Sequence, residues 1–163
     1  MRSILLAVVA LMFAAPAAAY ASAAESPLAF FEGRTISEGT TKILMRKPYE
    51  ARSQGVGRIE ADGTLNLVQQ VHEGDQPRKE RRWRMRQVAP GRFAGTMSEA
   101  IGPVSVEKVG ARFRFRFRMK GGLHVEQWLT PLADGMSARS TLTVRKLGIA
   151  VATGEALIRR IAH

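Results

Sequence analysis

Hydrophobic and polar residues alternate along most of the chain after residue 33, at the two-residue period of a β-strand whose faces meet different environments. Glycine, proline and aspartate interrupt this alternation about every 8–12 residues, the spacing that all-β sandwiches and barrels show. The pattern therefore predicts a series of short strands with these bounds: 34–44, 51–60, 64–72, 79–88, 92–99, 103–109, 112–119, 123–130 and 137–146.

Short turns fix how neighbouring strands pair. Residues 61–63 fit a three-residue hairpin loop with a left-handed glycine, which sets Ile59 opposite Leu65. Residues 110–111 suit a two-residue turn, and residues 120–122 suit a second three-residue loop. Consecutive hairpins make a meander, so we expect an antiparallel up-and-down barrel of about eight to ten strands.

The two ends of this β region follow other patterns. Residues 26–33 indicate a short turn of helix before the first strand. In the tail, apolar and small residues recur at helical spacing, while two glycines indicate bends; these residues are Ala150, Gly154, Leu157, Ile158 and Ile161, with Gly148. A closing strand over 155–161 and a C-terminal helix fit this pattern equally well.

The N-terminus has the three regions of a secretory signal peptide. Arg2 precedes an apolar run over residues 4–15, Pro16 ends the run, and small residues lead to a cleavage site after Ala23. The run is too short for a membrane-spanning helix, which needs about 20 apolar residues. We therefore predict a helical signal peptide at 1–23, one domain at 24–163, and a periplasmic or secreted protein.

The composition of the chain indicates which classes of partner it favours. The chain has no cysteine, so it forms no disulfide and lacks the residue that carries the acyl chains of a lipoprotein. Its 25 Lys and Arg against 14 Asp and Glu give a formal net charge of +11, which favours polyanionic partners. Because an exported protein meets little nucleic acid, we expect phosphate-rich envelope surfaces rather than nucleic acid as the counterpart.

Two segments alternate arginine with large apolar residues. Residues 112–119 put four guanidiniums on one strand face and three phenylalanines with a methionine on the other, and residues 82–86 repeat the scheme. Burying each Phe contributes about 1.5–3 kcal/mol, whereas burying an unpaired guanidinium costs several kcal/mol. We therefore expect the rings inside the barrel and these arginines outside: Arg82, Arg84, Arg86, Arg112, Arg114, Arg116 and Arg118.

The outer arginines allow two interpretations. They form either an anion-binding surface or a solvated face that keeps the protein soluble. The hairpin registers set Arg114 opposite Glu107 and beside Trp128, where a cation–π contact can form, and Arg116 opposite Glu126. We expect most of the positive charge to remain uncompensated.

The inward residues form the candidate ligand-binding lumen. It consists of Trp83, Met85, Phe93, Met97, Phe113, Phe115 and Phe117. In a barrel of this size such residues either fill the interior or line a cavity for one small ligand. The pattern leaves both alternatives open.

Residues for catalysis or metal binding are sparse. His72, His124 and His163 are not accompanied by a complete ligand pattern, and neither a nucleophile elbow nor a phosphate-binding loop occurs. We therefore expect no metal, no cofactor and no catalytic residues, and predict that the protein is not an enzyme.

Several short motifs, taken in order, resemble an uncharacterised family of bacterial envelope proteins, a domain of unknown function with a lipocalin-like barrel. The motifs are Phe30-Phe31-Glu32-Gly33, Gly57, Asp62-Gly63, Arg82-Trp83, Phe93-Ala94-Gly95, Ile101-Gly102, Glu126-Gln127-Trp128-Leu129 and Lys146-Leu147-Gly148-Ile149. The resemblance implies a lipocalin-like fold and favours the closing strand over the tail helix, but it implies no activity. Family members are often lipoproteins and carry fewer arginines, so their ligands do not transfer directly.

These observations lead to one functional hypothesis and two rivals. We expect an exported lipocalin-like protein that binds an amphipathic, anionic, lipid-like small molecule or envelope surface, with peripheral membrane contact through lipid head groups. The first rival is an interaction protein whose basic outer face docks an acidic protein or glycan. The second is a barrel enzyme acting on lipid or isoprenoid substrates. The oligomeric state stays open.

Overall fold

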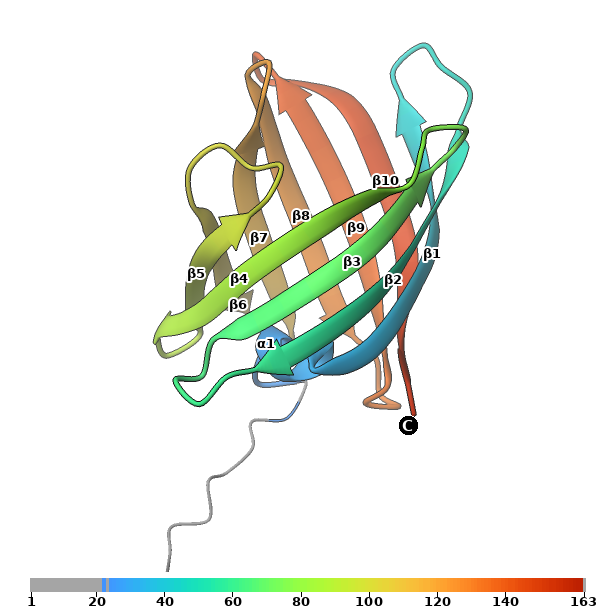
Figure 1. The fold of residues 1–163 in the computed structure, drawn as a ribbon. Coiled ribbons are helices and arrows are strands. Elements are labelled where there is room, and N and C mark those ends of the chain that lie inside the picture. Colours follow the sequence, from blue (N-terminus) through green and yellow to red (C-terminus); the bar gives the residue numbers. More distant parts are fainter. Residues whose placement is uncertain (1–21, 23, 163) are drawn as a thin grey trace, which may run out of the picture.

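The computed structural model describes Ser22 and residues 24–162, so the predicted signal peptide at 1–23 lies outside the described residues except for Ser22. The elements are α1 (Pro27–Phe31), β1 (Gly33–Ile43), β2 (Tyr49–Ile59), β3 (Leu65–Glu73), β4 (Lys79–Ala89), β5 (Arg92–Met97), β6 (Val104–Val109), β7 (Arg112–Met119), β8 (Leu123–Pro131), β9 (Ser137–Lys146) and β10 (Ile149–Ile161). Each strand pairs with its neighbours in sequence, and β1 pairs with β10 to close an antiparallel barrel (Figure 1). The predicted all-β, up-and-down barrel is confirmed.

The tail is a strand, which decides between the two alternatives that its sequence pattern allowed. β10 begins at Ile149, earlier than the predicted 155, and pairs with β1 from Ala152 opposite Ile43 to Ile161 opposite Arg34. A helix here would have left the edges of β1 and β9 with unpaired backbone groups, so strand pairing satisfies more hydrogen bonds. The closing strand that the resemblance favoured is confirmed.

The predicted hairpin registers are also confirmed. Ile59 lies opposite Leu65, and Phe117 lies opposite Val125. Gly63 has φ of 81°, the left-handed conformation that its loop requires. Because a shift of one residue would exchange the two faces of a strand, these registers fix which side chains enter the barrel.

The rings of the alternating segment turn inward. Phe113, Phe115 and Phe117 are 0%, 8% and 9% exposed, whereas Arg112, Arg116 and Arg118 are exposed and Arg114 is half-buried. The predicted orientation of this strand is therefore confirmed. Phe113 and its neighbours belong to a continuous apolar core that includes Leu65, Met85, Phe93, Val104, Val106, Leu129 and Ile158.

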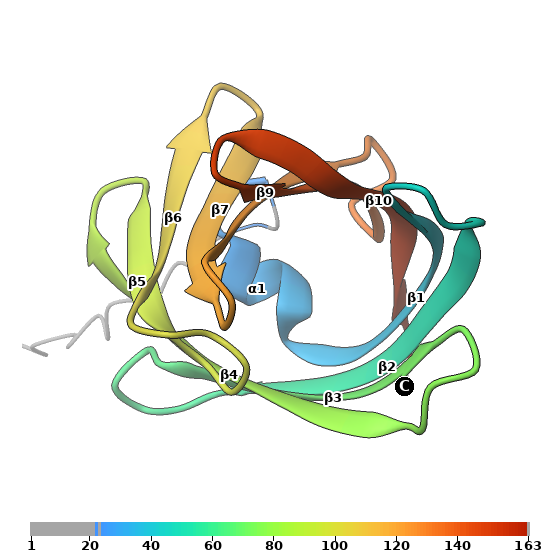
Figure 2. The same cartoon turned by 90° about the horizontal axis from the view of Figure 1, so that it is seen from above.

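Helix α1 closes one end of the barrel, and the view down the lumen shows it lying across that end (Figure 2). The Ser26 hydroxyl caps it by accepting a hydrogen bond from the Leu28 amide at 3.2 Å, and Pro27 stands at its first turn. Leu28 and Phe30 are buried, which anchors the helix in the core. No helix within residues 24–162 has the length and apolar character needed to span a bilayer.

Candidate ligand-binding site

The lumen contains a cavity of about 180 Å³ above α1. Strands β10, β1 and β2 line it with small residues, among them Thr35, Ser37, Ala51, Ser53, Gly154 and Ala156. The facing wall carries large apolar side chains, and α1 supplies Leu28 and Phe31 to the floor. The cavity exists because small residues on one side of the barrel do not fill the space that the large residues leave.

The rest of the lumen is filled. Phe93 and Phe113 meet edge to face with ring centroids 6.3 Å apart, and Trp83 meets Phe117 in the same way at 5.9 Å. Of the seven predicted lumen residues, Trp83, Met85 and Phe115 line the cavity, whereas Phe93, Met97, Phe113 and Phe117 pack in the core outside it. The barrel is thus partly filled and partly hollow, a combination of the two alternatives that the sequence left open.

Two polar side chains that line the cavity, those of Gln69 and Gln127, are hydrogen-bonded to other side chains. The Gln69 side-chain oxygen accepts from the Trp83 indole at 2.7 Å, and the Gln127 amide donates to the Ser140 hydroxyl at 2.8 Å. In the part of the chain that the structure describes, every fully buried side-chain nitrogen and oxygen has a partner. The polar part of the wall is therefore preorganised and needs no ligand to satisfy it.

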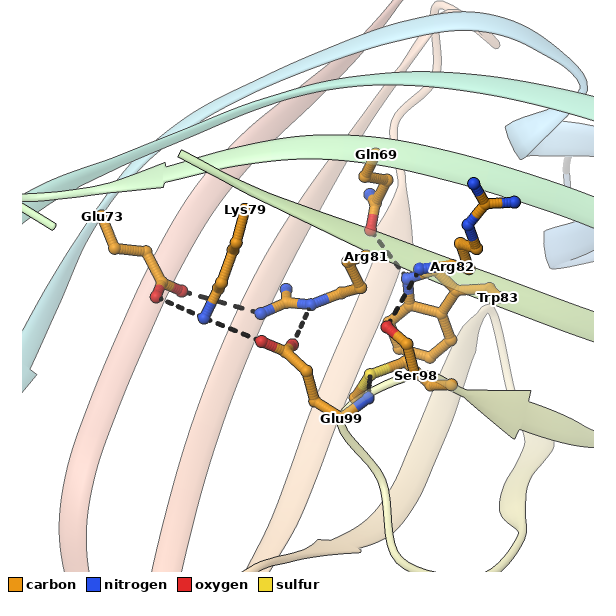
Figure 3. Close-up of polar contacts among 9 residues, drawn as sticks. Gln69, Glu73, Lys79, Arg81, Arg82, Trp83, Ser98 and Glu99 are labelled. Atoms are coloured by element: carbon orange, nitrogen blue, oxygen red, sulfur yellow. Dashed lines mark hydrogen bonds and ion pairs between the residues drawn. The ribbon is translucent and has the colours of Figure 1, made fainter. Parts of the chain in front are cut away.

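Four charged residues form a mouth cluster near the open end of the barrel: Glu73, Lys79, Arg81 and Glu99 (Figure 3). The Lys79 ammonium lies 2.9 Å from the Glu73 carboxylate and 2.8 Å from the Glu99 carboxylate. Arg81 donates from Nε to Glu99 and approaches Glu73 at 3.7 Å. Glu73 and Arg81 also line the cavity, so the cluster joins its polar side.

The ion pairs shift the pKa values of two groups in the mouth cluster, Glu99 and Lys79. Partial burial raises the pKa of the Glu99 carboxyl, but hydrogen bonds from Lys79 and Arg81 outweigh this effect and leave it below its ordinary value. Burial lowers the pKa of Lys79, and its bonds to Glu99 and Glu73 outweigh that effect and raise it. The cluster thus pairs two basic side chains with two carboxylates, and the charges within it cancel.

The strand pattern did not predict Arg81 and its partners as site residues. Arg81 shares the inward parity of Trp83 and Met85 on β4, and this was the available signal. An inward guanidinium contradicts the expectation that arginine faces water, unless a partner compensates its charge. That partner is Glu99, which comes from the β5–β6 loop, and strand alternation does not predict where a loop side chain lies.

The predicted outer arginines lie outside the cavity, and several are paired. Arg82 lies 2.6 Å from Glu80, and Arg84 lies 3.4 Å from Glu60. Arg114 also pairs with a carboxylate, that of the facing Glu107. The charge of the outer wall is therefore more fully compensated than predicted.

On the outer face of β6, β7 and β8, the arginines contact Trp128 and Glu107. Arg114 lies over the Trp128 ring at 5.5 Å, as its register predicted, and Arg112 lies closer, at 4.3 Å. Arg116 pairs with Glu107 at 3.5 Å rather than with the facing Glu126, whose carboxylate accepts from the Trp128 indole. Among the described residues, no carboxylate lies within 4 Å of three predicted anion-binding arginines: Arg86, Arg112 and Arg118.

His72 and His124, the two histidines that the structure describes, do not belong to a metal site. Over Ser22 and residues 24–162, no group of three or more histidine, aspartate and glutamate side chains is placed to hold a metal ion. His163 lies outside the described residues.

Comparison with known proteins identifies the fold of this chain but not its activity. No protein-family model and no curated protein matches the chain. Several solved structures share the barrel. The S-type phycobiliprotein lyase CPES from Guillardia theta has a TM-score of 0.66 and 7% identity, over 83% of this chain and 91% of that chain. Rv2717c from M. tuberculosis has a TM-score of 0.61 and 15% identity, over 83% and 96%.

The third structure is a protein of unknown function in the DUF3598 family from Nostoc punctiforme. Its TM-score is 0.56 at 11% identity, over 82% of this chain and 49% of that chain. At such identities the likeness shows the fold alone. The lipocalin-like barrel implied by the sequence motifs is confirmed in this sense.

Proposed function

We propose that this chain is an exported lipocalin-like protein that binds an amphipathic, anionic, lipid-like ligand. The apolar part of the ligand occupies the cavity between α1 and Trp83, and its acidic head meets Arg81 and Lys79. The observation that carries this proposal is a largely apolar cavity with basic side chains on its polar side: Arg81 and Arg52 line it, and Lys79 lies beside Arg81 in the mouth cluster. Export rests on the predicted signal peptide at 1–23.

The size of the cavity limits the group that it accepts. An engineered cavity of roughly 150 Å³ holds benzene, so about 180 Å³ accommodates one ring or a short alkyl segment. The remainder of a longer ligand leaves through the open end and passes the mouth cluster. A fold shared with a protein named as a lyase is compatible with the handling of a small molecule.

Exchange of ion-pair partners explains how a compensated cluster can bind an anion. The Glu99 carboxylate occupies the position on Arg81 that the ligand's acid would take, and Glu99 belongs to a loop rather than to a strand. A bound acid replaces Glu99 with similar charge-assisted hydrogen bonds. We propose binding rather than catalysis, because the charged groups at the cavity form ion pairs and not a nucleophile with a general base.

Two fluorescent probes with related ring systems test the proposal. Anilinonaphthalene sulfonate carries an anionic head, and phenylnaphthylamine does not. Arg81→Gln should weaken sulfonate binding about tenfold and leave phenylnaphthylamine binding unchanged. Arg82→Gln is the matched control, because Arg82 is the next residue on β4 and faces outward. Glu99→Gln should tighten sulfonate binding, because it removes the carboxylate that competes for Arg81.

Direct identification of the ligand completes the test. The protein is purified from cells that express the full chain, extracted with organic solvent and examined by mass spectrometry. An acidic amphiphile in the extract supports the proposal. An empty barrel that binds neither probe would remove it.

A second candidate function is docking of an acidic protein or glycan on the outer wall. It is favoured by Arg86, Arg112 and Arg118, which lack a nearby carboxylate in the described part of the chain. Arg112→Glu with Arg118→Glu should then abolish capture of an acidic glycan such as heparin on a column. The same pair of changes should leave phenylnaphthylamine binding intact.

A further inference from the structure

Two turns at the open end of the barrel expose apolar side chains to water. Met45, in the β1–β2 loop, is 96% exposed, and Leu147, in the β9–β10 turn, is 91% exposed. Leu44 and Ile149 stand beside them and are 57% and 64% exposed. We call Leu44, Met45, Leu147 and Ile149 the rim tips.

The backbone at the rim tips is as unusual as their exposure. Met45 and Leu147 have φ of 61° and 50°, and they are the two non-glycine residues with positive φ in the part of the chain that the structure describes. Glycine or asparagine adopts this conformation at lower cost. The left-handed backbone is costly for Met45 and Leu147, and exposure of their apolar side chains to water stabilises nothing. A role in binding therefore explains these two residues better than a role in folding does.

Positive charge surrounds the rim tips. Residues 42–47 contain Lys42, Arg46 and Lys47, residues 145–149 contain Arg145 and Lys146, and neither segment contains Asp or Glu. These five cations are exposed. Across Ser22 and residues 24–162, no carboxylate approaches any of the five within 4 Å.

The two turns project from the same end of the barrel. Figure 1 shows the β1–β2 and β9–β10 connections at the end opposite α1, and Figure 2 shows them on different sides of the open mouth. A hydrogen bond of 2.8 Å from the Leu44 amide to the Val151 carbonyl ties the base of one turn to the strand that leads from the other. Both tips can therefore meet one flat surface together, with the mouth facing it.

We propose that this rim docks on the surface of an anionic lipid bilayer. Met45 and Leu147 enter the boundary between head groups and acyl chains, and the five cations meet lipid phosphates, the combination that holds proteins at membrane interfaces. The inference rests on the proposed function, because a bilayer is where an amphipathic ligand is exchanged, and it names the part of the molecule that touches that bilayer. The arginines of the outer wall lack apolar tips of this kind and point sideways from the mouth.

Vesicle co-sedimentation with the full-length mature protein tests the docking. One vesicle population contains phosphatidylcholine alone, and the other also contains phosphatidylglycerol. The wild type should bind the anionic vesicles and lose binding as salt rises, because salt screens the charges. The double variant Met45→Asn with Leu147→Asn should bind anionic vesicles at least about tenfold more weakly than the wild type, because the apolar contact is lost. Asparagine tolerates the left-handed backbone, so the folded state should be at least as stable.

A matched control separates the rim from general hydrophobicity. Val88 is 53% exposed and lies near the end of β4 that leads to the closed end of the barrel. Val88→Asn should bind anionic vesicles as the wild type does. The proposal is overturned if the wild type ignores anionic vesicles, or if the paired tip variant binds them unchanged. It is also overturned if Arg114→Glu with Arg116→Glu abolishes binding, because the wall would then be the membrane face.

The same assays keep the two proposals apart. Arg81→Gln weakens binding of the sulfonate probe if the cavity takes an anionic ligand, and it should leave vesicle binding unchanged because Arg81 lies inside the mouth. Loss of vesicle binding in the tip variant with probe binding intact supports the docking surface. If the wild type binds the probe but binds no vesicles, the proposal of a cavity ligand stands and the proposal of membrane docking is overturned.

Discussion

At the residue scale, one step along a strand separates two arginines with different surroundings. Arg81 points into the barrel beside Trp83 and pairs with Glu99, while Arg82 points outward and pairs with Glu80. An inward charge is tolerated only where partners compensate it. The mouth cluster supplies that compensation, and its carboxylates must therefore stay ionised for it to hold.

This requirement predicts an acid-sensitive contribution to stability. The folded state lowers the pKa of Glu99 below its ordinary value of 4.5, so its ion pairs stabilise the fold above that pH and are lost as pH falls through the folded pKa. Glu99→Gln should cost about 1 kcal/mol at pH 7, a value reduced by partial solvent exposure. Urea unfolding should show this difference shrinking as the pH is lowered from 5 toward 3.

A surface ion pair provides the comparison for this experiment. Glu38 pairs with Arg159 at 3.1 Å, and both side chains are exposed. Glu38→Gln should change the free energy of unfolding at pH 7 by less than about 0.5 kcal/mol. A cost of Glu99→Gln that stays constant from pH 7 to pH 3 would show that its ion pairs do not carry the effect.

At the scale of elements, the short helix α1 depends on a glycine in the strand that it crosses. A Cβ placed on Gly57 would stand 1.9 Å from the Phe31 carbonyl oxygen, closer than any real contact allows. Gly57 thus lets the end of α1 approach β2, and this approach brings Leu28 and Phe30 into the core. The absence of a side chain at Gly57 therefore permits α1 to lie close to β2 at this end of the barrel.

Gly57→Ala should therefore destabilise the protein by about 1–3 kcal/mol, because the backbone of α1 must move away. Gly154→Ala is the matched control: its Cβ would meet its nearest neighbour, the Thr41 hydroxyl, at 3.4 Å, an ordinary contact. We expect that change to stay within about 0.5 kcal/mol of the wild type. Denaturant unfolding measures both, and equal effects of the two changes would contradict the close approach.

At the scale of the whole molecule, the uneven distribution of side-chain size around the barrel creates the binding space. Closure by β10 places Gly154 and Ala156 in the same wall as the small residues of β1 and β2. On the other side, Phe93, Phe113 and Phe117 fill the lumen. A barrel with the same strands and evenly sized inward residues would be solid.

Filling the cavity from its small-residue wall should weaken ligand binding without unfolding the barrel. Ser53→Leu adds an apolar side chain to the cavity from β2 and should lower phenylnaphthylamine affinity about tenfold or more, because the space is taken. Gln54→Leu, one residue on and facing outward, should leave the affinity unchanged. Fluorescence titration measures the affinities, and thermal unfolding checks that both variants fold. Unchanged probe binding by Ser53→Leu would place the probe outside the cavity.

Much of the barrel was predictable because its determinants are local. The alternation in residues 112–119 assigned the inward rings, and the turn at Gly63 set the register of its hairpin, since both depend on neighbouring residues only. The tail was not predictable from its own residues. Its strand conformation depends on the edge of β1, which lies more than a hundred residues earlier in the chain.

The amino-acid pattern alone predicts the strand order, the hairpin registers and the faces of most strand residues, because hydrophobic period and turn chemistry act over a few residues. The pairing of the tail with β1, the cavity, the partners of Arg81 and the placement of the β1–β2 and β9–β10 turns at the open end come from the three-dimensional fold. Each of these depends on how segments that are distant in sequence fill or leave space beside one another. Local sequence patterns do not report which distant segments meet, so these features can be described only from the three-dimensional structure.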